Sequence, residues 1–315
     1  MKPFNVFPYD SHINFMRVRM VSLVIAALLM FAAIGAMAVN GFNFALDFTG
    51  GVGIELRFAK PVEVEAVRSR LAGAGYENAQ VQSFGTGTDL LIRLQKREGG
   101  SSASTSIAQE VKQAASTAEN PAEVRSSAEI SAQVGKELRD KGILALVFVI
   151  VGFLIYISFR FEWKFAVAAI ITTLHDVIIV VGWFALSGHE FDLTVLAGAL
   201  SVMGYSVNDT IVVFDRVREN FRSMRATPSE VLNASVNQTL SRTVITSFVA
   251  FLTVLALYIY GGSSLRGMAE SQMIGIIIGT LSSIFVACPL LMWLGASKQD
   301  LMPKARDEAA LARRP

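Results

Sequence analysis

Six long apolar segments limit what this chain can fold into. A helix needs about 20 mostly apolar residues to cross the ~30 Å hydrocarbon core of a bilayer, at about 1.5 Å per residue. Segments close to that length occur at 20–39, 142–159, 165–187, 193–214, from 243 to at least 257, and at 271–294. Only 17% of the residues are charged, whereas soluble domains carry about a quarter. The sequence therefore predicts an α-helical membrane protein with six transmembrane helices.

The first apolar segment has features of a signal peptide and of a membrane anchor. Arg17 and Arg19 precede it, and Ala36 and Ala38 near its end are small residues of the kind found before a cleavage site. Its apolar run, however, is longer than the ~7 to 15 residues of a signal peptide. We therefore expect a retained anchor.

Basic residues near the ends of the spans predict the orientation, because Lys and Arg in short connections resist translocation. They gather in the N-terminal segment, the turn at 160–164, the loop around 216–225 and the C-terminal tail. The turn at 188–192 has none. We therefore expect cytoplasmic segments at 1–19 and 296–315, and an exported, periplasmic connection at 40–141. The net charge of +2 gives no indication of nucleic-acid binding.

The exported connection has the pattern of a small α+β domain. Predicted strands lie at 52–58, 79–84, 89–94 and 124–130, and predicted helices at 61–71 and 107–115, with a Ser- and Gly-rich flexible insertion at 96–106. This β-α-β-β-α-β order is that of a split, ferredoxin-like unit. We find no His and Cys cluster and no nucleophile with a base, so we predict a binding or structural role, with no catalytic, metal or cofactor site.

Asp209 is the first of the polar residues that interrupt the apolar segments. It lies about six residues, or roughly 9 Å, before the charged run at 215–219. An ionised carboxylate at such a depth costs at least ~2.5 kcal/mol, so it must be protonated, paired or in contact with water. Arg242 begins the fifth segment at the same end of the bundle, where the two side chains can meet. A static ion pair and a proton carrier both fit this pattern.

Two further polar residues, His175 and Asp176, lie near the middle of the third segment. As neighbours on a helix they point about 100° apart, so we expect them to face different surroundings. The sequence does not distinguish two roles for these residues: they can line a polar pathway, or they can form hydrogen bonds that pack the helices together. His175, Asp176 and the two residues that flank Asp209, Asn208 and Thr210, are the candidates for polar support of the pathway. Ala197, Ser201 and Gly204 form a face of small residues on the fourth segment, as Gly275 and Gly279 do on the sixth.

Several of these residues belong to longer motifs that resemble the SecF members of the SecD/SecF family of bacterial protein-export subunits. The matching stretches are LDFTGG at 46–51, LHD at 174–176, the stretches 204–210 and 213–220 around Asp209, QTLSRT at 238–243 and the Gly- and Ser-containing stretch at 274–284. They occur in the order expected for the family, from Asp47 to Pro289.

The resemblance implies a six-helix subunit of the bacterial inner membrane, related to the resistance-nodulation-division transporters. It implies a SecD partner, assistance to the SecYEG channel in exporting unfolded preproteins, and use of the proton gradient. YajC and YidC are further candidate partners, and membrane lipid surrounds the spans. In this resemblance Asp209 matches the proton-carrying carboxylate and Arg242 its paired arginine. No cofactor is implied.

Two other classes of function fit the residues alone. A half-transporter for small lipophilic molecules shares the bundle and the intramembrane carboxylate, and drug sensitivity of a deletion strain distinguishes it from an export subunit. A non-transporting scaffold for the exported domain retains its activity when Asp209 is replaced by Asn.

The charge pattern generates a topology prediction. Reporter fusions at Ser102 and Arg222 should report opposite compartments, because the first lies in the long exported connection and the second in a basic cytoplasmic loop. The measurement is alkaline phosphatase and fluorescent-protein activity of matched fusions. Finding both positions on the same side of the membrane contradicts the six-span model.

Overall fold

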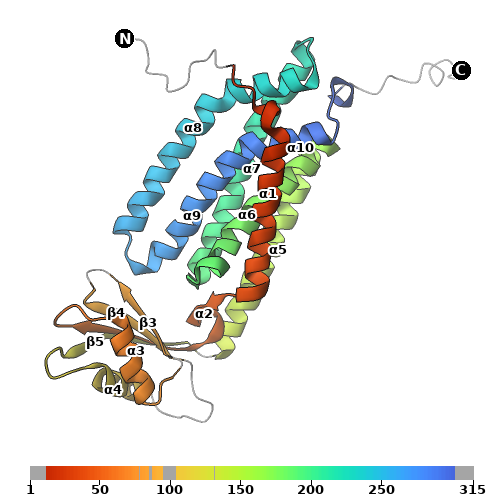
Figure 1. The fold of residues 1–315 in the computed structure, drawn as a ribbon. Helices are drawn as coiled ribbons and strands as arrows, with labels where there is room; N and C mark the ends of the chain where they lie inside the picture. The colour runs from red at the N-terminus through yellow and green to blue at the C-terminus, as the bar shows by residue number, and fades with distance from the viewer. Residues whose placement is uncertain (1–11, 78, 85–86, 95–103, 131, 302–315) are drawn as a thin grey trace, which may run out of the picture.

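Among the residues that the structure describes, six helices are long and apolar enough to cross a membrane, as predicted, and they form the body of the molecule. The computed structural model describes residues 12–301 except 78, 85–86, 95–103 and 131. The spans are α1 (Arg19–Asn40), α5 (Ala132–Arg160), α6 (Trp163–Ser187), α7 (Leu193–Ser223), α8 (Pro228–Tyr260), and α9 (Ser263–Ser282) continued by a π-helical turn (Ser283–Ala287) and α10 (Cys288–Trp293). A short 3-10 helix at Phe15–Val18 leads into α1, and another at Lys298–Leu301 follows α10. The helices stand side by side, with an α+β domain at one end (Figure 1).

The helices of the second, fifth and sixth spans begin well before the apolar segments that predicted them. The sixth begins at Ser263, where the sequence predicted Ser271. The second span begins at Ala132, where the sequence predicted Gly142, and the fifth begins at Pro228, where the sequence predicted Thr243. The start of α8 is fixed by a capping box in which Thr227 N donates to Glu230 Oε2 at 2.8 Å and Thr227 Oγ1 accepts from Glu230 N. Hydropathy detects only the apolar part of a helix, so polar extensions beyond that part are missed.

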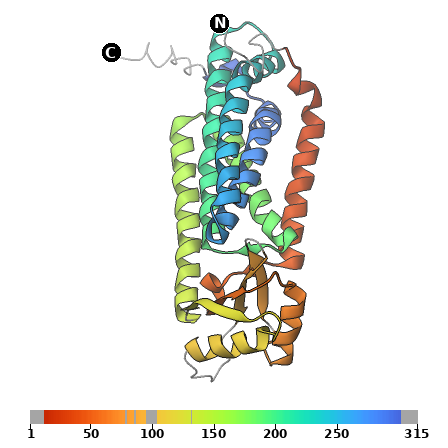
Figure 2. The same cartoon turned by 90° about the vertical axis from the view of Figure 1, so that its left-hand side faces the viewer.

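Small residues let α7 and α9 approach closely. Gly275 of α9 lies against Val202, and Gly279 lies against Ser206 of α7. On the other side of the bundle Gly182 of α6 lies against Ala33 of α1. Helices in lipid associate through such close contacts, because no hydrophobic effect drives one apolar helix onto another. Figure 2 shows α1 and α5 at opposite edges of the bundle.

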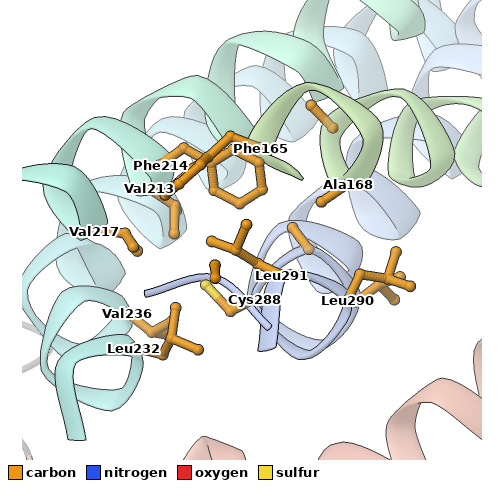
Figure 3. Close-up of a cluster of buried hydrophobic side chains, with 14 of the residues drawn as sticks. Phe165, Ala168, Val213, Phe214, Val217, Leu232, Val236, Cys288, Leu290 and Leu291 are labelled. Carbon is orange, nitrogen blue, oxygen red and sulfur yellow. The ribbon is translucent and has the colours of Figure 1, made fainter. Parts of the chain in front are cut away.

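A hydrophobic cluster closes the bundle at the end opposite the α+β domain. Side chains of α6, α7, α8 and α10 meet there around Cys288 and Leu291 (Figure 3). Phe165 and Phe214 pack edge to face, with ring centroids 5.5 Å apart, the geometry that aromatic pairs favour. This packing fixes the helices at one end, and the α+β domain joins them at the other.

The α+β domain has the predicted order of elements. It contains β2 (Gly51–Phe58), α3 (Val64–Gly73), β3 (Gln80–Phe84), β4 (Asp89–Leu94), α4 (Ser104–Ala115) and β5 (Ala122–Ile130). The sheet order is β3-β4-β2-β5 with every neighbouring pair antiparallel, which is the split arrangement expected for the ferredoxin-like order. In Figure 2, α4 lies on the side of the sheet away from the bundle. Most of the predicted flexible insertion, at 96–103, lies outside the described residues.

An ion pair joins two strands of this domain. Arg57 Nε donates to Asp89 Oδ1 at 2.7 Å, and Arg57 Nη2 donates to Asp89 Oδ2 at 3.1 Å. The hydrogen bond from the Arg57 guanidinium holds the pKa of the Asp89 carboxyl below its usual value. The pair therefore contributes to stability above the unfolded carboxyl's pKa, and that contribution is lost as the pH falls through the folded-state value.

The domain is docked on the bundle by elements that the sequence did not predict. Strand β1 (Asn43–Phe44) pairs in parallel with β6 (Glu190–Phe191) from the turn between α6 and α7. The short helix α2 (Leu46–Thr49) follows β1. Arg93 of β4 forms an ion pair with Glu190, and the Leu193 N–H donates to Asp47 Oδ2 at 3.3 Å. Two-residue strands carry no periodic signal, so only the three-dimensional structure reveals this junction.

The close contact between α7 and α9 generates a stability prediction. A methyl group at Gly275 overlaps Val202, so Gly275→Ala should lower the apparent melting temperature by several degrees in detergent. Gly152→Ala is the matched control, because nothing lies within 4 Å of the added methyl group. Thermal unfolding followed by size-exclusion chromatography measures both variants. Equal melting temperatures for Gly275→Ala and Gly152→Ala contradict close packing at this site.

Candidate functional site

Asp209 lies in the interior of the bundle and is held by two hydroxyl groups. Its side chain belongs to α7 and is buried. Thr243 Oγ1 of α8 donates to Asp209 Oδ1 at 2.9 Å, and Ser283 Oγ of the π-helical turn donates to Asp209 Oδ2 at 2.6 Å. Short O–H···O⁻ hydrogen bonds of this kind are roughly twice as strong as neutral ones. The two hydroxyl groups satisfy both carboxyl oxygens of Asp209 inside the bundle without a directly bonded cation.

Arg242 does not form the ion pair with Asp209 that the sequence suggested. Among the described residues, no Arg242 nitrogen lies within 4.0 Å of a carboxylate oxygen, and the side chain is exposed. The reason is helical geometry, since Arg242 and Thr243 point about 100° apart and Thr243 is the residue turned toward α7.

A second carboxylate, that of Asp176, lies fully buried on α6. Ser206 Oγ of α7 donates to Asp176 Oδ2 at 2.5 Å, and Ser282 Oγ of α9 donates to the same oxygen at 2.6 Å. His175 Nδ1 lies 2.8 Å from Asp176 Oδ1. Asp176 therefore joins three helices. His175 and Asp176 bind each other directly, a contact that their angular separation on the helix did not lead us to expect.

Two consecutive serines connect the carboxylates. Ser282 ends α9 and donates to Asp176, and Ser283 begins the π-helical turn and donates to Asp209. Single π-helical turns inside α-helices are frequent at functional sites. Neither serine was predicted to bind a carboxylate. The only sequence feature that could have indicated this role is the presence of two serines, Ser282 and Ser283, within an apolar segment.

The polar centre continues through a chain of hydroxyl groups toward α8. Tyr205 OH donates to Ser247 Oγ at 2.9 Å, and Thr280 Oγ1 lies 2.7 Å from the same oxygen. Ser283 Oγ also lies 3.0 Å from the carbonyl oxygen of Thr280. A hydroxyl group both donates and accepts hydrogen bonds. These hydroxyl groups can therefore exchange hydrogen-bond partners without leaving a donor unpaired.

The two residues that flank Asp209 do not support it directly. Asn208 is exposed on the outer face of α7. Thr210 is fully buried, and its Oγ1 has no hydrogen-bond partner among the described residues. Neither side chain forms a hydrogen bond with Asp209 among the described residues, and their part in a polar pathway stays a prediction. Within the same residues, no group of three or more His, Cys, Asp or Glu side chains is placed to hold a metal ion.

The hydroxyl pair at Asp209 generates a quantitative prediction. Ser283→Ala removes one charge-assisted hydrogen bond and should lower the free energy of unfolding by about 1–3 kcal/mol. The loss should be smaller in the Asp209→Asn background, because the serine then no longer faces a negative charge. Denaturant titration of the four proteins of this cycle gives the coupling energy.

The control for this cycle is Ser158→Ala. Ser158 lies on the exposed side of α5, and its hydroxyl donates to its own helix at Leu154 O. Its removal should leave the free energy of unfolding within about 0.5 kcal/mol of the parent value. If Ser283→Ala costs the same with and without the Asp209 charge, the hydroxyl does not stabilise that charge.

Comparison with known families gives matches along most of the chain. Residues 110–297 match the C-terminal model of the protein-export membrane proteins SecD/SecF, and residues 35–62 match the SecD/SecF GG motif. The SecF translocase subunit of Pseudomonas aeruginosa is 45% identical over 94% of this chain and 96% of its own length. The SecF subunit of Vibrio alginolyticus is 41% identical over 95% of each chain.

A solved structure has the same fold. The crystal structure of SecDF, a translocon-associated membrane protein from Thermus, superposes with a TM-score of 0.81 at 37% identity over 92% of this chain. The chain spans 40% of that longer SecDF chain. The SecDF subunit of Brucella abortus is similarly 38% identical, and the match covers 38% of its length. The chain belongs to the SecF family of protein translocase subunits.

Proposed function

We propose that this chain works with a SecD partner in the inner membrane and uses the proton gradient to assist preprotein export. The observation that carries this proposal is Asp209, a buried carboxylate that makes hydrogen bonds to two neighbouring helical elements. Intramembrane ionisable residues are expensive and mark ion or proton pathways by default. Membership of the SecF family supports the role in preprotein export. The buried carboxyl group of Asp209 supports the use of protons, because it can bind and release one.

The proposed proton step exchanges the partners of Asp209. In the described state Thr243 and Ser283 hold the carboxylate, and Arg242 lies outside. A movement of α8 that replaces Thr243 by Arg242 exchanges a neutral donor for a full positive charge. Hydrogen bonds and nearby charges both alter how strongly a carboxyl holds its proton. Alternation between the two states, with access to one side of the membrane and then the other, moves protons.

The energy available from each proton is modest. One elementary charge that crosses about 150 mV releases ~3.5 kcal/mol. That amount is enough to shift a two-state equilibrium by more than a hundredfold, but it is small beside the work of moving a whole polypeptide. Many protons per exported chain are therefore required, with an ATP-driven motor and the SecYEG channel performing the first part of the transport.

The surface for SecD is the outer face of α7. Ala197, Ser201, Gly204 and Asn208 follow one another at intervals of three or four residues, and all four are exposed in the single chain. Small residues at this spacing permit close helix contact, and Asn208 supplies a polar group for an interhelical hydrogen bond. SecDF chains whose match to this one covers about two fifths of their length support a second, SecD-like part beside it.

The same proposal includes an orientation and a set of transient partners. The start of α1 and the α10 segment lie at the end of the bundle opposite the α+β domain (Figure 1). That end carries the Arg160–Asp215 and Arg218–Glu162 ion pairs. We place it in the cytoplasm and the α+β domain in the periplasm, where unfolded preprotein emerges. SecYEG, YajC and YidC are the further partners in this proposal.

The function is tested by removing the titrating group. Asp209→Asn keeps the side-chain shape and should abolish the stimulation of preprotein export by a proton gradient, while ATP-driven export and co-purification with SecD persist. The assay is export into inverted membrane vesicles with and without a gradient. Asp215→Asn is the matched control, because Asp215 lies in a half-exposed ion pair at the end of the bundle. An undiminished gradient response of Asp209→Asn supports the scaffold function.

A further inference from the structure

The α+β domain and the helical bundle have separate hydrophobic cores. The core of the domain lies between its sheet and the helices α3 and α4, and its buried members fall within residues 52–122. The neighbouring cluster at the end of the bundle is formed by Phe48, Phe184, Phe191 and Val195. The two clusters share no described residue. Domains that meet without a large hydrophobic interface are expected to move relative to one another.

An ion pair joins the sheet to the bundle. Arg93 of β4 pairs with Glu190 of β6, and the two side chains are only 17% and 11% exposed, so salt screens this pair little. The carboxylates of Asp47 and Asp192 also attract the Arg93 guanidinium. One cation of the sheet therefore faces three carboxylates at the end of the bundle. Loss of either member of such a pair leaves the other charge largely buried and unpaired.

A neutral hydrogen bond lies at the same junction. Gln80 Nε2 of β3 donates to Asn43 Oδ1 of β1 at 3.0 Å, and both side chains are exposed to solvent at this contact. Hydrogen bonds between neutral groups are about half as strong as those between charged groups. The position of the sheet on the bundle therefore depends mainly on Arg93.

The chain crosses from the bundle to the sheet at two consecutive glycines. Helix α2 ends at Thr49 and packs against the start of α5, where the backbone of Phe48 lies close to Gly135. Strand β2 begins at the second glycine, Gly51. Gly50 and Gly51 have φ values of +70° and +140°. Glycine adopts such conformations, and others, at little cost, so the chain can change direction here while α2 stays on α5.

Glu190 is positioned by the two helices that carry the buried carboxylates. Strand β6 follows α6, which contains Asp176, and precedes α7, which contains Asp209. At the start of α7, Asp192 Oδ1 accepts a hydrogen bond from Val195 N at 2.7 Å, and this cap fixes the end of β6 to the helix. Movement of α6 relative to α7 therefore displaces Glu190.

We propose that the Arg93–Glu190 ion pair is a latch that holds the α+β domain on the bundle. When the latch opens, the domain turns about Gly50 and Gly51. Strand β1 and helix α2 stay with the bundle in both states, because β1 pairs with β6 and α2 packs on α5. The latch concerns the position of the domain and does not depend on the use of protons by Asp209.

The latch is tested by electron spin resonance distance measurements on the full chain in lipid nanodiscs. Nitroxide labels at Gln109→Cys on α4 and Ser264→Cys on α9 report the position of the domain, because both residues are exposed. The native Cys288 is buried and stays unlabelled. The parent should give one narrow distance distribution. Arg93→Gln should raise the population outside it about tenfold, as expected for the loss of a charge-assisted hydrogen bond.

Matched variants separate the latch from a general loss of charge. Arg57→Gln is the control, because Arg57 lies on the same face of the sheet but pairs with Asp89 inside the domain; its distance distribution should equal that of the parent. Arg93→Lys keeps the charge and should fall between the parent and Arg93→Gln.

The bundle side of the latch is tested by Glu190→Gln. This variant should raise the same population as Arg93→Gln does, and the double variant should give no further rise, because both substitutions break one interaction. A variant of each partner also ensures that a folding defect in one of them is not mistaken for release of the domain.

A second pair of labels tests the turning point. Ala128 is exposed on β5 and pairs with Gly53 of β2, two residues after the glycine pair. In the Arg93→Gln background, the distance from Ala128→Cys to Ser264→Cys should broaden less than the distance from Gln109→Cys, because a residue near the turning point moves through a shorter arc.

Three results overturn the proposal. Equal distance distributions in Arg93→Gln and Arg57→Gln show that the ion pair does not hold the domain. Effects of Arg93→Gln and Glu190→Gln that multiply in the double variant show that the two residues act independently. Equal broadening for labels at Ala128 and Gln109 excludes a turn about the two glycines.

Discussion

Two carboxylates inside an apolar bundle need hydrogen-bond donors, and this requirement organises the transmembrane part of the molecule. Asp176 takes its donors from α7 and α9, and Asp209 takes its donors from α8 and the π-helical turn. Each neighbouring helix must therefore approach within hydroxyl reach, about 2.5–3 Å between oxygens. The glycines that face α7 make this approach possible, so the small residues and the polar centre are parts of one arrangement.

Much of this arrangement could be predicted from the sequence. The length of the apolar segments predicted the number of transmembrane helices. The alternation of apolar and polar residues predicted the strands of the α+β domain. The free-energy cost of a charged side chain in the membrane identified Asp209 as a candidate site residue. The side chain of α8 that contacts Asp209 could not be predicted. Whether Thr243 or Arg242 faces Asp209 depends on a rotation of α8 by one residue, about 100°. The ends of α5 and α8 were also missed, since polar helical turns beyond the hydrocarbon have no hydropathy signal.

The junction with the α+β domain shows a different limit of sequence analysis. Asn43 and Phe44 pair with residues almost 150 positions later in the chain, and no local pattern connects the two segments. Loops that meet across the bundle are positioned by the helices that carry them. The Arg93–Glu190 ion pair then adds a contact between the sheet and the turn that follows α6. Local rules can therefore predict each part without predicting how the parts are joined.

The consecutive serines give the polar centre a property that neither carboxylate has alone. Ser282 and Ser283 share one peptide unit, and each binds a different carboxylate. A shift of the π-helical turn that lengthens one hydrogen bond must move the other serine as well, because the peptide unit is planar and stiff. The hydrogen bonds of Asp209 and Asp176 are thereby joined through one peptide unit. Groups that share a hydrogen-bond network show interaction energies of about 0.5–3 kcal/mol, so we expect removal of one carboxylate to alter the hydrogen bond that the neighbouring serine makes to the other.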